Sequence, residues 1–143
     1  MATPWSSSSR RGGAILALLL GGCVTTTTVA YVPEANAERL SLEQGEELLA
    51  QFVGAECPRL VEERKAERVT RVELDLDNRG MVTEARLDRS IGDDRLDGII
   101  GAVAAKLHLD PPAGQRRSPE QGELRAGYRC ESSGAPYVVL QRL

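Results

Sequence analysis

The spacing of apolar residues after position 41 predicts a helix at the start of the folded part of the chain. Ser41 and Gln44 fit a capping box, in which each side chain bonds the backbone N–H of the other residue. The apolar residues that follow at helical spacing are Leu42, Leu48, Leu49, Phe52 and Val53. Gly54 and the Cys57-Pro58 pair predict the end of this helix. The alternating charges of residues 59–68 predict one or two further helical turns with a solvated face.

A two-residue period then predicts a β-hairpin. In residues 69–76, the side chains of Val72, Leu74 and Leu76 fall on one face and charged side chains fall on the other. Residues 77–80 favour a turn, because Asn and Gly tolerate positive φ there. Residues 81–88 have the pattern of the partner strand, with Met81, Thr83, Ala85 and Leu87 expected on one side.

A second helix and two more strands complete the pattern. After a loop at residues 90–94, capped by Asp93 or Asp94, one apolar stripe contains Leu96, Ile99, Ile100, Val103, Ala104 and Leu107. Pro111-Pro112 predicts a stop, residues 115–122 form a polar loop, and residues 124–131 and 137–143 have the pattern of strands. This order predicts the α+β class: a small antiparallel sheet of three to four strands packed against an amphipathic helix, with an N-terminal helix before it.

The first 22 residues have the layout of an export signal. Arg10 and Arg11 precede an apolar run at residues 14–20, which is shorter than the ~20 residues that cross a bilayer. The run ends in Leu20-Gly21-Gly22-Cys23, which resembles the lipobox of bacterial lipoproteins. That resemblance implies cleavage before Cys23 and acylation of this cysteine. The alternative is a secretory signal cut after Ala37, far beyond the apolar run.

The lipobox resemblance also implies how the chain is divided and where it resides. Residues 1–22 are then a lipoprotein signal peptide, residues 23–40 a flexible tether without an apolar period, and residues 41–143 the folded domain. Several acyl chains hold a protein stably at a membrane. Val24 follows the cysteine in place of an aspartate, which implies the outer membrane by resemblance to enterobacterial sorting. We therefore expect a lipid-anchored protein of the cell envelope that faces the periplasm.

Charge and cysteine content narrow the choice of partners. Without Arg10 and Arg11 the chain keeps 16 basic against 21 acidic residues and shows no basic stripe, so nucleic acid is not an expected partner. With Cys23 acylated, Cys57 and Cys130 are the remaining thiols. In an oxidising compartment we expect them to form a disulfide, and the alternative is two buried reduced thiols.

Short motifs follow one another in a fixed order between residues 58 and 113. They are Pro58, the strand at residues 69–76, Gly80, Val82, Ala85, Ser90, Gly92, Leu96-Asp97 and Leu109-Asp110-Pro111-Pro112-Ala113. This order resembles the C-terminal domain of TonB-family energy transducers. Of the family-motif residues Ser90, Gly92, Leu96, Asp97 and Pro111, the resemblance implies a structural role for Asp97 at the junction of loop and helix. The chain departs from the family at Leu109, where an aromatic residue is usual, and has no proline-rich spacer.

No group of residues has the pattern of a catalytic or metal-binding site. His108 is the single histidine, and its place favours interaction with the last carbonyls of the second helix. Residues 75–80 imitate the start of a calcium loop, but Arg79 and Arg86 stand at two ligand positions. Helix capping explains the acidic residues Asp93, Asp94 and Asp97, and the two thiols lack Cys-x-x-Cys spacing. We therefore expect that this protein is not an enzyme and that it binds neither a cofactor nor a metal.

The TonB resemblance implies a domain that binds protein. The expected function is a membrane-anchored periplasmic lipoprotein that takes up a protein segment by strand addition at an exposed sheet edge. Such a protein would be associated with TonB-type energy transduction or outer-membrane transport. The alternative is a structural envelope lipoprotein that serves as a spacer or assembly subunit. The last two strands either complete the sheet or swap into a second copy, so a homodimer is also open.

Overall fold

Two long central strands organise the fold, because the apolar residues on one side of each must be buried. The computed structural model describes residues 28–111, 119–132 and 135–143. The elements are β1 (Ala30–Tyr31), α1 (Leu42–Glu62), β2 (Glu67–Leu76), β3 (Val82–Leu87), α2 (Asp94–Ala105), β4 (Glu120–Arg129) and β5 (Tyr137–Arg142). The described strands form one antiparallel sheet in the order β1-β3-β2-β4-β5. The α+β class is confirmed, whereas the sheet has five strands instead of three or four.

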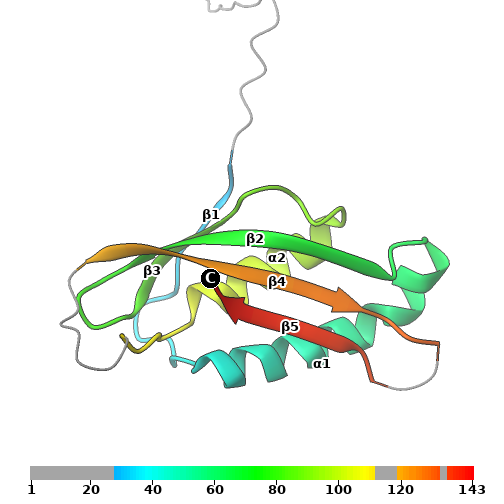
Figure 1. Ribbon diagram of the computed structural model, residues 1–143, viewed down its shortest axis with the longest axis horizontal. Coiled ribbons are helices and arrows are strands. Elements are labelled where there is room, and N and C mark those ends of the chain that lie inside the picture. Colours follow the sequence, from blue (N-terminus) through cyan, green and yellow to red (C-terminus); the bar gives the residue numbers. More distant parts are fainter. Residues whose placement is uncertain (1–27, 112–118, 133–134) are drawn as a thin grey trace, which may run out of the picture.

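Both helices cover the same face of the sheet (Figure 1). α1 packs along β5, and α2 packs along β3. The inward side chains of β2 and β4 form one core with those of the helices, and its members include Val72, Leu74, Leu124, Leu49, Leu60, Leu96 and Ile100. Burial of these side chains is the main force that holds the layers together. In the described part of the chain, the opposite face of the sheet has no helix over it.

Helix α1 begins where the sequence predicts but continues past both predicted breakers. The capping box between Ser41 and Gln44 is present, with N···O distances of 2.9 and 3.1 Å. Gly54 and Pro58 both lie inside the helix, so the predicted end at these residues is wrong. Tertiary contacts override the local signals, because the last turns are tied to the sheet through Cys57.

The hairpin of β2 and β3 has the predicted turn but a different inner face. Gly80 has a φ of 85°, and Asp77 Oδ1 accepts hydrogen bonds from two backbone N–H groups of the turn at 2.8 and 3.0 Å. The pairing register shifts by one residue between Asp75 and Leu76. This irregularity turns Val82 into the core and leaves Thr83 exposed. The prediction that Thr83 shares a side with Ala85 and Leu87 is therefore wrong.

Part of the predicted tether belongs to the fold. β1 pairs with the outer side of β3. The ring of Tyr31 lies against Gly101 of α2, where a Cβ atom would come within 2.3 Å of the ring. Leu40 bridges to Leu107. The tether prediction is wrong at these positions, because one aromatic ring and a facing glycine anchor the chain without any apolar period. The predicted signal peptide at residues 1–22 and Cys23 lie outside the described residues.

The segment after α2 leaves the helix earlier than predicted. α2 ends at Ala105, well before Pro111. Leu107 and Leu109 remain buried, and the backbone N–H of His108 donates to Leu40 O at 2.8 Å. These backbone pairings compete successfully with continued helix, so the predicted stop at the proline pair is wrong.

The predicted disulfide is present. Cys57 of α1 and Cys130, directly after β4, are bonded with a Cα–Cα distance of 5.5 Å. The bond joins the helical layer to the sheet.

Candidate functional site

The loop before α2 brings together three of the family-motif residues. Asp97 Oδ2 accepts a hydrogen bond from Ser90 Oγ at 2.5 Å, and Asp97 Oδ1 accepts one from Ile91 N at 2.7 Å. Gly92 N donates to Ser90 Oγ at 3.0 Å, and Gly92 has a φ of 97°, which favours glycine. The polar atoms of this loop bind one another, so they hold the turn and offer little to a ligand.

The other two family-motif residues lie elsewhere. Leu96 is 0% exposed in the core under the sheet. Pro111 is half-buried and lies beyond the segment that pairs with Leu40 and Met81. The five motif residues therefore do not line one cavity.

Asp93 is a buried carboxylate whose partners are all structural. It is the N-cap of α2 and accepts from Leu96 N at 3.1 Å. It also accepts two hydrogen bonds from the Arg59 guanidinium, at 2.7 and 3.1 Å, and lies 3.4 Å from Lys65 Nζ. These hydrogen bonds hold the pKa of the Asp93 carboxyl well below its usual range, and those from Arg59 contribute most. A carboxylate held in this way cannot serve as a proton carrier near neutral pH.

The remaining polar candidates are also engaged in the fold. Asp75 pairs with Arg86 at 3.1 Å, which lowers the pKa of Asp75, and Asp77 holds the hairpin turn. His108 Nε2 lies 2.8 Å from Arg79 O, so its imidazole contacts the hairpin turn and not the end of α2. No group of three or more His, Cys, Asp or Glu side chains suited to a metal occurs among the described residues.

The outward side of the sheet, here called the open face, carries two hollows and a row of charged side chains. The pairing register of β2, β4 and β5 arranges its side chains in rows across the strands. The apolar row is Val69, Gly127 and Val139; the arginine row is Arg71, Arg125 and Gln141; the glutamate row is Glu73 and Glu123, with Leu143 beside them.

A hollow of about 460 Å³ lies over the apolar row. Gly127 adds no side chain to the hollow and is itself buried, since a Cβ atom there would come within 3.1 Å of Arg68 O and 3.2 Å of the Val69 side chain. Val69 and Tyr137 stand beside it with 63% and 58% of their surface exposed. Arg125 and Arg129 reach its rim, and the Arg129 guanidinium lies 5.3 Å from the Tyr137 ring centroid. The hollow can therefore take an apolar side chain with polar groups next to it.

A second hollow of about 360 Å³ lies over the arginine row and contains Arg89 and Asp88 as well. Arg71 and Arg125 are directly opposite each other on neighbouring strands, where like charges are unfavourable. Within the described ranges, neither of them has an ion pair or side-chain hydrogen bond. Residues 1–27, 112–118 and 133–134 contain no Asp or Glu that could supply one. The charge of this row is available to a partner.

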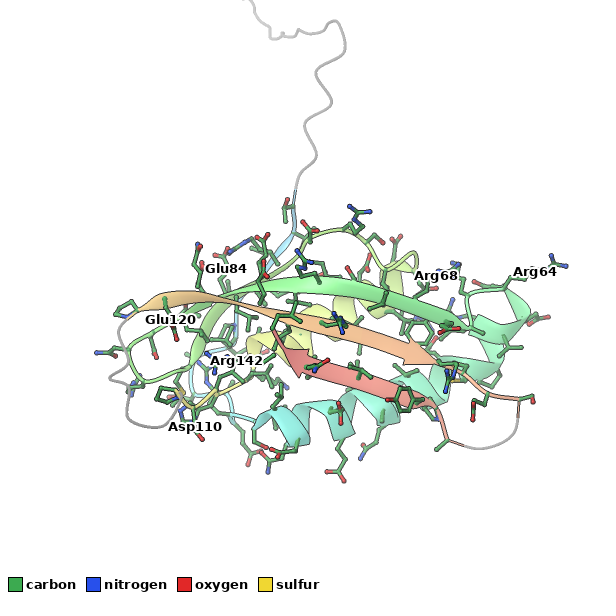
Figure 2. The ribbon with its side chains drawn as sticks, in the orientation of Figure 1. Arg64, Arg68, Glu84, Asp110, Glu120 and Arg142 are labelled. Carbon is green, nitrogen blue, oxygen red and sulfur yellow. A yellow bond between two sulfur atoms is a disulfide. The ribbon has the colours of Figure 1, made fainter. Side chains whose placement is uncertain are left out.

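The outer edge of β5 adjoins the first of these hollows, which is lined by Tyr137, Val139 and Gln141 of that strand. β5 pairs with β4 on one side, and no other described strand pairs with it. Leu140 N points away from β4, since it donates to Glu46 Oε2 of α1 at 2.8 Å. By the alternation of an antiparallel strand, the N–H groups of Val138 and Arg142 face the same outer side. Figure 2 shows Arg142 between Glu120 and Asp110 at one end of the sheet, where it donates to Asp110 O at 2.8 Å.

Sequence reasoning did not find the arginine row. Its two arginines are far apart in the chain and meet only through the register of β2 and β4. The alternation of polar residues at residues 69–76 predicts that Arg71 lies on the outward side of its strand. It does not predict that Arg125 lies opposite.

No protein-family model, no curated protein and no solved structure matches this chain significantly. Among the described residues, no helix has both the length and the hydrophobicity needed to span a bilayer.

Proposed function

We propose that this chain is a lipid-anchored protein of the bacterial envelope whose folded domain binds a segment of another protein. The anchor is acylated Cys23 after removal of residues 1–22, and the domain faces the periplasm from the outer membrane. Residues 41–143 are proposed to form a TonB C-terminal-like domain with a preceding helix, on the resemblance of residues 58–113, with a role in TonB-type energy transduction or outer-membrane transport. The sequence motifs carry these assignments.

The observation that supports the binding function most directly is the outer edge of β5 next to the hollow over the apolar row. A strand with one free side can accept a further strand through main-chain hydrogen bonds, and pockets beside it select side chains. No other described strand pairs with the outer side of β5, where Glu46 of α1 holds Leu140 N, and the hollow over the apolar row is lined by Tyr137 and Val139 of β5. Main-chain pairing would give affinity, and the hollow would give selectivity.

Glu46 suggests how the free edge is protected before binding. Its carboxylate accepts the hydrogen bond of Leu140 N that a carbonyl of an added strand would accept. Charged side chains that cover an edge are a common protection against unwanted pairing. An incoming segment replaces this carboxylate with its own carbonyl, and Glu46 returns to solvent, so the edge stays satisfied in both states.

A crosslinking pull-down from envelope membranes tests the proposal. We expect the full-length chain to capture one envelope protein, and we expect Cys23→Ala to lose this product because the domain is released from the membrane. Membrane fractionation of the same two samples confirms the release. Recovery of only the chain itself would support the alternative, a structural spacer or assembly subunit.

A further inference from the structure

We infer that the segment bound by this domain carries an apolar residue and, two positions away, an acidic residue. The inference rests on the proposed function and names the chemistry of its partner. It starts from the order of the rows on the open face: the apolar row is followed by the arginine row, which is followed by the glutamate row.

The spacing of the rows sets the spacing in the partner. Val69 and Arg71 are two residues apart on β2, as Gly127 and Arg125 are on β4, so the rows lie about 7 Å apart. In an extended segment that runs along the strands, side chains two positions apart point to the same side at the same spacing. A strand added at the outer edge of β5 continues these rows beyond Val139 and Gln141, so an apolar side chain in line with the apolar row places its second neighbour in line with the arginine row.

The charge of the second position follows from the arginine row. Arg71 and Arg125 face each other without an ion pair in the described part of the chain, and Arg89 adds a third guanidinium to the same hollow, which Asp88 and Leu143 also line. A carboxylate placed there gains charge-assisted hydrogen bonds and relieves the repulsion between the two arginines. The row thus selects Asp or Glu over a neutral or basic side chain.

The glutamate row argues against an extended polyanion. Glu73 and Glu123 lie directly opposite each other, one row beyond the arginines. A nucleic-acid strand or an anionic membrane surface that covered the arginine row would meet this second like-charged pair within about 7 Å. Both arginines also lie in hollows of the sheet, which a side chain can enter and a flat membrane cannot. A short protein segment with a single acidic residue fits both features.

Peptide titrations of the 15N-labelled full-length chain test the inference. The probes are extended ten-residue threonine peptides that carry one tyrosine and, two positions later, glutamate, lysine or threonine. We expect the glutamate peptide to bind at least about tenfold more tightly than the lysine peptide, a factor that corresponds to about 1.4 kcal/mol. The amide signals of Val69, Arg71 and Gly127 should shift during that titration.

The double variant Arg71→Gln/Arg125→Gln should bind the glutamate and threonine peptides equally and should remain folded, since it removes a repulsion. The matched control is Arg64→Gln/Arg79→Gln, which has the same change of charge and should keep the preference. Figure 2 shows Arg64 pointing into solvent at the far end of the sheet, and Arg79 is 74% exposed in the hairpin turn.

The outcomes separate this inference from the proposed function. Equal binding of all three peptides, or a preference that survives in the arginine variant, overturns the inference even if the amides of Val138 and Arg142 shift and the edge function stands. Binding to anionic phosphatidylglycerol vesicles that depends on Arg71 and Arg125, without peptide binding, also overturns it. Absence of any peptide binding overturns it as well, while the envelope crosslinking decides the proposed function independently.

Discussion

Replacement of both Cys57 and Cys130 by alanine is expected to lower the free energy of unfolding by about 4 kcal/mol. The disulfide closes a loop with a sequence separation of 73 residues, so its loss gives the unfolded chain much conformational freedom. It also joins α1 to the end of β4, and Cys130 is only 7% exposed, so little solvent separates the two layers there. Urea denaturation of the wild type and of the double variant measures the difference.

Reduction provides the matched control for this prediction. Dithiothreitol should lower the stability of the wild type to that of the double variant and should leave the double variant unchanged. The double variant avoids the unpaired thiol that either single substitution would leave. A difference in unfolding free energy below about 1 kcal/mol would contradict the role assigned to the bond, given the ~4 kcal/mol expected.

The second large effect is expected at Asp93. Asp93→Ala should cost about 3 kcal/mol, because it leaves Arg59 without its closest carboxylate and removes the N-cap of α2. Asp93→Asn keeps a good N-cap residue and should cost about 2 kcal/mol, a value that is reduced because the Arg59 side chain is 31% exposed. Asp94→Asn is the matched control, since its exposed carboxylate lies in the same helical turn, and its cost should stay below about 1 kcal/mol.

The same ion pair predicts a dependence of stability on pH. Arg59 holds the pKa of Asp93 below its ordinary value of 3.8, so the folded state binds the proton more weakly than the unfolded state. The resulting stabilisation is complete above about pH 5 and is lost as the pH falls from about 4 through the pKa of the folded state. Urea denaturation between pH 7 and pH 2 should therefore show a steeper decline for the wild type than for Asp93→Asn. Parallel curves would contradict the assignment.

Short sequence motifs correctly predicted the parts of the fold that depend only on residues close together in the chain. The capping box at Ser41 needs only residues three positions apart, and the turn at Gly80 needs only a residue that accepts positive φ. Asp93, one of two predicted caps, is the N-cap of α2. The disulfide could be predicted by elimination, because the expected acylation of Cys23 leaves two thiols.

The misplaced elements depend on contacts between distant residues. Pro58 stays in a helix because the disulfide and the buried turn after it hold that helix against the sheet. Tyr31 forms part of a strand because its ring fits the space left by Gly101. The spacing of apolar residues along the chain predicts neither of these two contacts. The same reason applies to the candidate site, since the contact between Glu46 and Leu140 joins positions that no local pattern relates.

The most direct test of protein binding at the β5 edge is crosslinking in envelope membranes with Val138→Pro and Val138→Ala. The N–H of Val138 faces the outer side of β5, so proline removes a donor to an added strand without breaking a bond to β4. Alanine shortens the same side chain and keeps the donor. We predict that the crosslinked product of the full-length chain falls at least about tenfold with proline, equivalent to about 1.4 kcal/mol, and persists with alanine. Equal product from both variants, or none from the wild type, would contradict the account.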